Sequence, residues 1–240
     1  DAIEQMAHRS PDYDLVVCGG GDGTLDEVVS GMMKSGFNTP VGYIPAGSTN
    51  DFASSLAIPR DMVKAAQDIV DGHLFSVDVG SFNEDNFIYV AAFGMFTDVS
   101  YETSQDLKNI LGHLAYVMEG AKRIFDVKTY HLCVEANGEV HEGDYIYGMI
   151  TNSHSIGGFR NLVGNDVEMD DGLFEVTLIK KPKNPLELNE IIAALINAYD
   201  DTDMIDAFKA NSLYIHGDEA ISWTLDGEFG GEHKEVRIKN

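Results

Sequence analysis

A run of glycines between a short apolar segment and an amphipathic one constrains this chain more than any other feature. Residues 14–18 (DLVVC) have the length and composition of a buried strand in a parallel sheet. Directly after them comes Gly19-Gly20-Gly21-Asp22-Gly23-Thr24, and apolar residues then recur at helical spacing over residues 25–34. Gly36 lies where a left-handed cap would end that helix. This strand, turn and helix predict one unit of an α/β fold with a parallel sheet.

The alternation of strand and helix continues to about residue 72. Residues 41–44 predict a second strand, and a Pro-Ala-Gly loop then leads to Ser48, Thr49, Asn50 and Asp51, whose side chains are typical helix caps. Residues 60–71 form an amphipathic helical pattern closed by Gly72. Residues 1–9 have the character of the end of a helix. Together these segments predict an N-terminal parallel-sheet, Rossmann-like α/β domain.

The pattern changes near residue 75. Short apolar runs then alternate with turns such as Asn137-Gly138, which is typical of antiparallel β-structure. The expected strands are residues 75–79, 87–92, 131–136 and 145–152, and the expected helices are residues 106–125 and 186–198. We therefore predict two domains: residues 1–76 as the α/β domain and residues 77–240 as a β-rich sandwich.

Composition and charge exclude several classes of protein. A formal net charge of -24 argues against binding to nucleic acid or nonspecifically to anionic lipid, because both need a positive field. The longest apolar runs are far shorter than the roughly 20 residues of a membrane-spanning helix. We expect no signal peptide, because no basic segment followed by an apolar stretch opens the sequence, although a trimmed N-terminus would hide one. Cys18 and Cys133 each lie in an apolar run, which favours buried thiols and a reducing cytoplasm over a disulfide or metal site.

Any contact with a membrane must therefore be local. Scattered solubilising charge is the favoured interpretation of the candidate basic residues. These residues are Lys108, Lys122, Arg123, Lys128, Arg160, Lys180, Lys181 and Lys183. The eight histidines are dispersed, none forms a metal-spaced pair, and His154 beside two glycines has the character of a loop or core residue. We assign the histidines no role.

The glycine turn has the chemistry of a phosphate-binding loop. Without Cβ atoms its backbone can approach a polyphosphate, and amides at the start of the next helix point toward negative charge. Asp22 inside the turn would repel phosphate unless a divalent cation lies between them, so we expect Mg2+ nearby. A strand-to-helix turn can also use three glycines for geometry alone. The expected nucleotide-binding residues in and after this turn are Gly20, Gly21, Asp22, Gly23, Thr24, Leu25, Asp26 and Glu27.

Two motifs at matched spacing resemble a known family. Gly-Gly-Asp-Gly-Thr in this position is similar to the turn of kinases that share an ATP site among phosphofructokinases, NAD kinases and diacylglycerol-type lipid kinases. The second loop, Gly47-Ser48-Thr49-Asn50-Asp51 followed by Phe-Ala, resembles the G-T-x-N-D-F-A element of the bacterial diacylglycerol kinases. This resemblance implies that ATP and Mg2+ bind between two domains and that the γ-phosphate passes to a lipid hydroxyl at a membrane surface. It also adds Gly47, Ser48, Thr49, Asn50 and Asp51 to the expected nucleotide site.

The same resemblance extends to two C-terminal elements. In Leu225-Asp226-Gly227-Glu228 it implies that Asp226 is the general base and that Glu228 supports it or the metal. Taken alone, an Asp-Gly pair is more often a hairpin turn. In Asp170-Asp171-Gly172-Leu173 it implies a structural Mg2+ held by the Asp171 carboxylate and by the main-chain carbonyls of Glu168 and Leu173. A solvated acidic turn is the alternative there, because Asp166, Glu168, Asp170 and Asp171 form an acidic run.

The chain departs from the family pattern at several points. Asp26 stands where the family usually has Asn, which places a carboxylate beside the phosphates. Ser48 replaces the usual Thr and keeps the hydroxyl. We expect a trimmed N-terminus, because the family's opening strand and N-P-x-x-G loop do not precede residue 1, and a further closing strand after Asn240.

Diacylglycerol is the first-choice acceptor, and two other functions stay open. A kinase of the same superfamily could act on a soluble acceptor such as NAD, and a non-catalytic lipid- or nucleotide-binding protein would also explain Asp26 and the late start. The resemblance implies a cytoplasmic protein that associates peripherally with membranes. A homodimer is left open.

Overall fold

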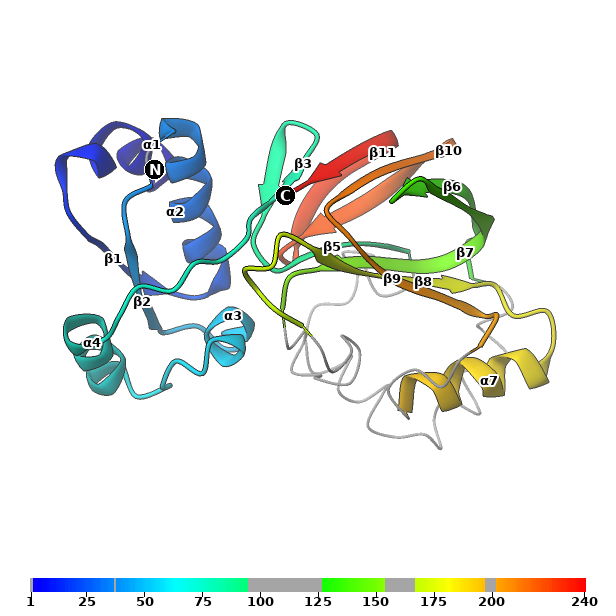
Figure 1. Ribbon diagram of the computed structural model, residues 1–240, viewed down its shortest axis with the longest axis horizontal. Helices are drawn as coiled ribbons and strands as arrows, with labels where there is room; N and C mark the ends of the chain where they lie inside the picture. The colour runs from blue at the N-terminus through cyan, green and yellow to red at the C-terminus, as the bar shows by residue number, and fades with distance from the viewer. Residues whose placement is uncertain (1, 37, 95–126, 154–166, 197–201) are drawn as a thin grey trace.

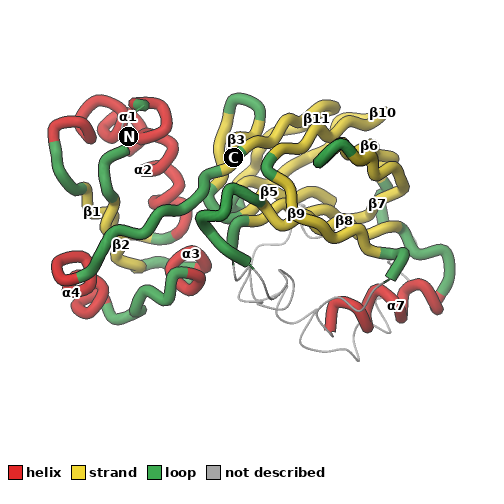
Figure 2. Tube along the Cα trace, viewed as in Figure 1, coloured by secondary structure: helices red, strands yellow, loops and turns green. Residues whose placement is uncertain are grey.

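The structure is a computed structural model that describes residues 2–36, 38–94, 127–153, 167–196 and 202–240. Several expectations lie outside these residues: the helix at residues 106–125, and Lys108, Lys122, Arg123, His154, Arg160 and Asp166. In the described part, the molecule has a helical N-terminal region and a strand-rich C-terminal region side by side (Figures 1 and 2).

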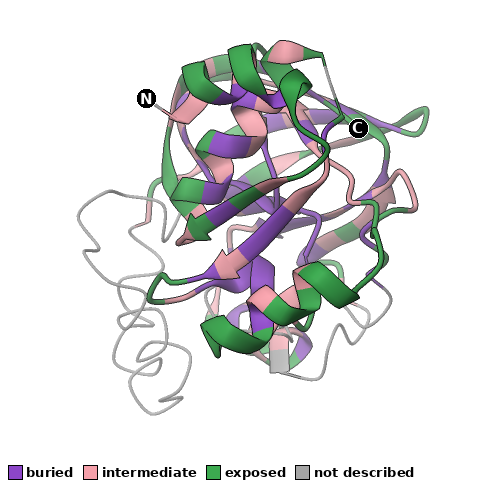
Figure 3. Ribbon diagram, turned by 90° about the vertical axis from the view of Figure 1, so that its left-hand side faces the viewer, coloured by how far each residue is buried: buried purple, intermediate pink, exposed green. Residues whose placement is uncertain are grey.

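The N-terminal domain is built on two parallel strands, as predicted. β1 (Val16–Gly20) pairs with β2 (Val41–Pro45), and the register aligns Gly20 with Pro45. Helices surround this pair: α1 (Ala2–Arg9), the 3-10 turn η1 (Ser10–Asp12), α2 (Asp22–Ser35), α3 (Asp51–Ser55) and α4 (Met62–Asp71). Gly36 ends α2 in the left-handed conformation with φ 68°, as expected. Figure 3, which looks onto this domain, shows exposed residues on the outer helical surfaces and buried ones on the inner side.

The C-terminal domain is one antiparallel sheet that folds over on itself. Its strands are β3 (Gly80–Phe82), β4 (Asp85–Phe87), β5 (Val90–Gly94), β6 (Tyr130–Ala136), β7 (Glu139–Thr151), β8 (Phe174–Lys180), β9 (Ile205–Ala210), β10 (Ser212–Leu225) and β11 (Glu228–Lys239). Their order is β4-β3-β11-β10-β5-β7-β8-β9. Within the described part of this domain, the one helix is α7 (Pro185–Ile196). The β-rich character of this half is confirmed.

Two long strands organise that sheet. β10 pairs with β6 over its first half and with β5 over its second half, and β7 pairs with the same two strands on their other side. β5 and β6 thus lie between the same two strands. Trp223, Tyr145, Phe93 and Phe174 are almost completely buried in the core between the layers. Alternating inward residues along strands of this kind supply most of the hydrophobic stabilisation.

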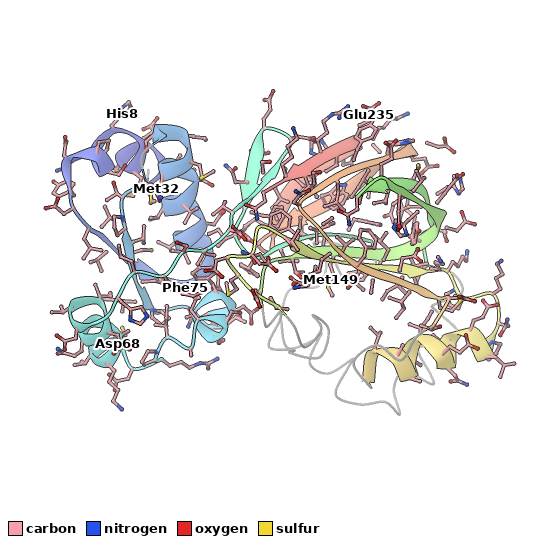
Figure 4. The ribbon with its side chains drawn as sticks, in the orientation of Figure 1. His8, Met32, Asp68, Phe75, Met149 and Glu235 are labelled. Carbon is pink, nitrogen blue, oxygen red and sulfur yellow. The ribbon has the colours of Figure 1, made fainter. Side chains whose placement is uncertain are left out.

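A second apolar cluster joins the two domains. Leu25 and Phe52 from the N-terminal domain pack in it with Ile88, Val90 and Met149 from the C-terminal domain. Figure 4 shows Phe75 on the connection between the domains and Met149 on the β-rich side. Because this surface is buried and apolar, it holds the N-terminal half of α2 against the start of β5.

Two expected strands need correction. Residues 87–92 are not one strand, because β4 ends at Phe87, a bend follows and β5 begins at Val90. Residues 75–79 are not a strand at all. Residues 75–79 form an extended connection without sheet pairing, and the first strand of the second sheet starts at Gly80. Asp78 N–H donates to the Met169 carbonyl at 2.8 Å, so tertiary hydrogen bonds replace a ladder there. The predicted domain boundary near residue 76 falls in this connection. None of the helices within the described ranges is long and apolar enough to cross a bilayer.

Candidate active site

The glycine turn and the second loop touch through their backbones. A Cβ on Gly47 would lie 2.5 Å from the Gly21 Cα, and one on Gly21 would lie 3.3 Å from the Gly47 Cα. The Ala46 N–H donates to the Gly20 carbonyl at 2.8 Å. Both loops follow the carboxyl ends of parallel neighbouring strands, where ligands bind in α/β folds. The two motifs therefore build one surface, and glycine is required at the contact.

The start of α2 is open to a ligand. Gly21 is the N-cap residue, and no side chain caps the helix there. The contrast is α4, where the Asp61 carboxylate accepts the N–H groups of Val63 and Lys64 at 3.0 Å each. A Cβ on Gly23 would have no neighbour within 4 Å. Free amides at a helix N-terminus attract anions, so this end of α2 can receive a phosphate group.

The second loop is held in shape by Asn50. Its backbone is left-handed with φ 54°, its Oδ1 accepts the Gly47 N–H at 2.9 Å, and its Nδ2 donates to the Gly47 carbonyl at 2.8 Å. The Tyr43 hydroxyl donates to the Gly20 carbonyl at 3.2 Å and so ties the first loop to β2. Arg60 donates to the Thr49 carbonyl at 3.3 Å. Tyr43 and Arg60 were not expected from the sequence, because neither lies in a motif.

Asp22 has a structural task that the sequence did not indicate. Its Oδ2 accepts the Asp51 N–H at 3.1 Å, and its Oδ1 accepts the Phe52 N–H at 3.4 Å. The carboxylate therefore caps α3, whose own N-cap residue makes no side-chain cap. This capping explains an aspartate in the turn without a metal. The assignment of Asp22 as a metal ligand stays a prediction.

Asp226 occupies a hairpin turn and is buried at the same time. It joins β10 to β11 with φ 51°, and Gly227 follows with φ 90°. The side chain reaches the start of β5, where Oδ2 accepts the Ile88 N–H at 2.6 Å and Oδ1 accepts the Tyr89 and Val90 N–H groups at 3.0 and 2.9 Å. Because β10 is antiparallel to β5, the end of one strand meets the beginning of the other. Asp226 is 5% exposed, whereas Glu228 in the same turn is exposed.

Carboxylates from both domains converge around Tyr89. Burial raises the pKa of Tyr89 well above its ordinary value, and the charges of Asp226, Asp22, Asp51 and Asp26 raise it further. The Tyr89 hydroxyl donates to the Asp226 carbonyl at 3.0 Å. The hairpin at residue 226 therefore lies beside the glycine turn, although the two are about 200 positions apart. Tyr89 itself lies in no motif and was missed.

Burial and neighbouring carboxylates raise the pKa of two acidic side chains in this cluster. Burial raises the pKa of Asp226 to about 7, against the opposing effect of its three backbone hydrogen bonds, and the charge of Asp26 adds to the rise. Burial raises the pKa of Asp26 to about 6, with further contributions from Glu27, Glu228 and Asp85. Among the described residues, no basic side chain forms an ion pair with Asp22, Asp26, Asp226 or Glu228. Unbalanced carboxylate oxygens are the ligand type that Mg2+ takes.

The second expected metal position is different. The Asp171 carboxylate accepts the Leu173 N–H at 2.9 Å, and its other oxygen pairs with the Lys209 ammonium at 3.3 Å. Lys209 also pairs with Glu175 at 3.2 Å. Gly172 donates to the Asp78 carboxylate at 2.7 Å, which ties this turn to the domain connection. A metal on Asp171 and on the carbonyls of Glu168 and Leu173 must share its charge with Lys209, so this site stays a prediction.

A cavity of about 930 Å³ lies between the domains, next to β2 and α4. Tyr43, Ser55 and Ile69 line it from the N-terminal domain, and Val167 and Glu168 line it from the C-terminal domain. The Ser55 and Ser153 hydroxyls are 2.7 Å apart and join the domains near it. The two loops and the acidic cluster thus gather at one junction, and Tyr43, which donates to the Gly20 carbonyl, connects that junction to the cavity.

Comparisons with known proteins agree with this arrangement. The family model of the diacylglycerol kinase catalytic domain matches residues 1–82, and the YegS C-terminal NAD kinase beta sandwich-like domain matches residues 90–237. A diacylglycerol kinase of Staphylococcus carnosus (strain TM300) is 35% identical over 96% of this chain and 75% of the relative. One of Bacillus subtilis (strain 168) is 34% identical over the same shares.

Solved structures show the same fold. A crystal structure of a diacylglycerol kinase from Bacillus anthracis str. Sterne matches with a TM-score of 0.76 and 23% identity over 100% of this chain and 77% of that one. A second structure from that strain matches with a TM-score of 0.78 and 25% identity, over 100% and 78% of the two chains. From the two family models and the curated relatives, this chain belongs to the diacylglycerol kinase family of lipid kinases.

Proposed function

We propose that this protein transfers the γ-phosphate of ATP to the hydroxyl of diacylglycerol and forms phosphatidic acid, with Mg2+ required. One observation carries the proposal: the exposed Glu228 and the buried Asp226 of the second domain lie beside the open N-terminus of α2. The influence of Glu228 on the pKa of Asp26, and of Asp26 on that of Asp226, supports this proximity. Phosphoryl transfer needs mainly positioning and charge neutralisation, which these groups can supply.

The phosphate end of the nucleotide would bind at the two loops. The amides of Asp22 and Gly23 at the start of α2 are free for it, and the Gly21 to Gly47 contact leaves room for a close approach. Ser48 and Thr49 line the second loop. Mg2+ at the cluster would neutralise the developing charge on the phosphates. It would also balance the carboxylates that form no ion pair with a basic side chain.

The geometry favours a division of labour between Asp226 and Glu228. All three backbone donors bind the Asp226 carboxylate, and its 5% exposure leaves little room for a lipid hydroxyl. Glu228 is exposed one residue beyond Gly227. We therefore assign to Glu228 the proton of the acceptor hydroxyl as its oxygen attacks the γ-phosphorus and ADP leaves. Asp226 is then a positioning residue that holds the turn, rather than the base that the resemblance implied.

The acceptor is tested directly with radiolabelled ATP, Mg2+ and the full chain. Separate reactions contain diacylglycerol in mixed micelles, other lipid alcohols, or NAD. We expect the label in a lipid product that migrates with phosphatidic acid. Transfer to NAD alone would replace the proposal with the soluble-acceptor alternative, and no transfer in any reaction would favour a non-catalytic binding protein.

The role of each carboxylate is tested by Glu228→Gln and Asp226→Asn. Removing an essential base costs at least about 10²-fold in kcat, so we expect that loss for Glu228→Gln at an unchanged melting temperature. Asp226→Asn should lower both kcat and the melting temperature. A fully active Glu228→Gln, together with a stable but inactive Asp226→Asn, would return the role of base to Asp226.

A further inference from the structure

A second cluster of metal-ligating side chains lies on the outward face of β6 and β10. Cys133 and Glu135 are on β6, and His216 is on the half of β10 that pairs with β6. The half of β10 that leads to Asp226 pairs with β5 instead. The cluster is therefore separate from the candidate active site. Glu235, which pairs with His216 across β10 and β11, is on the edge of the β-rich domain in Figure 4.

Sheet register brings the three side chains together. Cys133 is the direct cross-strand partner of His216, so the two point to the same face. Glu135 is two residues farther along β6 and shares that face. Leu132 and Val134, which flank Cys133, point into the core. The Cys133 sulfur, an imidazole nitrogen of His216 and a carboxylate oxygen of Glu135 all lie within 4.8 Å of one another.

The neighbouring histidine on this face has a different setting. His131 lies 3.0 Å from Asp144 and 3.4 Å from Glu142, so two carboxylates already flank it. The His216 imidazole has Glu135 at 3.7 Å, which is longer than a hydrogen bond. Cys133 is half-buried rather than buried, contrary to the expectation for this thiol. Solvent and a metal ion can thus reach the space between the three groups.

The donor set selects the kind of ion. Thiolate and imidazole are ligands for zinc-type ions, whereas Mg2+ takes oxygen ligands. Zinc binds sulfur at about 2.3 Å and nitrogen or oxygen at about 2.0–2.2 Å, so tetrahedral ligand atoms lie roughly 3.5 Å apart. Movement of about 1 Å by three side chains on an open face closes that difference. We propose that Cys133, Glu135 and His216 bind Zn2+, with water as the fourth ligand.

Such an ion would link two strands. β6 and β10 would be bridged by a bond network from one face, so binding should stabilise the folded sandwich relative to the unfolded chain. This inference does not depend on the identity of the phosphate acceptor. Its readouts are metal stoichiometry, spectrum and melting temperature, and none of them requires kinase activity.

The test uses the full chain, freed of metal and kept reduced. Zn2+ is titrated in competition with a chromophoric chelator, and Co2+ is then added as a spectroscopic substitute. We expect one equivalent of Zn2+, a thiolate-to-Co2+ charge-transfer band and the d–d bands of tetrahedral Co2+. We also expect excess Mg2+ to leave this binding unchanged, because Mg2+ competes poorly for thiolate and imidazole ligands.

Variants assign the ligands. Cys133→Ser and His216→Asn should each weaken Zn2+ binding at least about tenfold, and Cys133→Ser should also abolish the charge-transfer band. His131→Asn is the matched control on the same face and should bind as the wild type does. Circular dichroism and an unchanged melting temperature of the metal-free protein verify that each variant folds. Equal Zn2+ binding by wild type and Cys133→Ser, or Co2+ spectra without the thiolate band, would overturn the proposal.

Discussion

Two hairpin turns of nearly identical backbone differ completely in their surroundings. Asn137-Gly138 joins β6 to β7 with φ 55° and 81°, and Asp226-Gly227 joins β10 to β11 with φ 51° and 90°. The Asn137 side chain is exposed and donates to the Lys209 carbonyl at 2.7 Å. The Asp226 side chain is buried beside the apolar cluster that joins the two domains, and it accepts three backbone N–H groups at the start of β5. The same turn conformation is therefore used both at the periphery and at the candidate active site.

The largest expected effect comes from replacing the Asp226 carboxylate with the amide that the other turn carries. Asp226→Asn replaces an acceptor by an amide whose NH2 cannot accept, which leaves buried N–H groups unpaired at about 1–3 kcal/mol. We expect a lower free energy of unfolding and a kcat reduced by up to about 10²-fold, because a misplacement of the catalytic Glu228 by about 1 Å can cost that much. Urea unfolding and the lipid-kinase assay measure both quantities.

The matched change at the peripheral turn is Asn137→Asp. It should alter stability by no more than about 0.5 kcal/mol and leave kcat unchanged, because the site is exposed. Equal losses in the two variants would show that burial does not distinguish the turns.

Alanine at the turn glycines sharpens the comparison. Gly227→Ala and Gly138→Ala place a Cβ at φ 90° and 81°, so each should cost about 1–2 kcal/mol. Open space surrounds the Gly138 position, and the Tyr89 hydroxyl is 3.9 Å from the Gly227 one. We expect similar drops in melting temperature but a lower kcat for Gly227→Ala alone. Unequal stability with equal activity would contradict the assignment of the turn to the site.

Tyr89→Phe tests the anchoring of the Asp226 turn from its second side. The variant loses the hydrogen bond from the hydroxyl to the Asp226 carbonyl, which is worth about 1 kcal/mol. We expect a small fall in the free energy of unfolding and little change in the KM for ATP. A wild-type stability would mean that this bond does not hold the turn.

The smallest effect concerns pH. Asp26 has a folded pKa of about 6, above its ordinary value, so its stabilising contribution is complete in acid and is lost as pH rises through 6. Asp26→Asn should therefore be more stable than the wild type at pH 8 and similar at pH 4. Because Asp26 is partly solvated, we expect a gain below about 1 kcal/mol. Melting curves from pH 4 to 8 measure it.

The remaining pH dependence provides the control for Asp26. Asp226 also has a raised folded pKa, about 7, and its contribution declines in the same direction. The Asp26→Asn protein should keep a smaller decline that ends near the folded pKa of Asp226, because the charge of Asp26 supplies part of that raised pKa. A wild type whose stability rises between pH 5 and 8 would contradict both shifts.

Local pattern was enough for the elements and the two loops, but not for how their side chains are used. The capping of α3 by Asp22 joins residues about 30 positions apart, and Lys209 reaches Asp171 from a different strand. Residues 75–79 had a strand-like composition but found tertiary partners instead of a ladder. Cys133 and His216 are too far apart in the sequence to show a metal-binding spacing, because only the register of β6 with β10 makes them neighbours.

The sequence by itself determined the α/β start, the β-rich second half, the two glycine-containing loops and the family. Those features depend on periodicity, turn residues and short-range spacing, which a linear chain displays directly. Only the tertiary structure decided which carboxylates meet, which are buried and which remain in solvent. Burial and the approach of like charges set the pKa of a carboxylate, and both arise when β10 brings residue 226 back to β5 and to the start of α2.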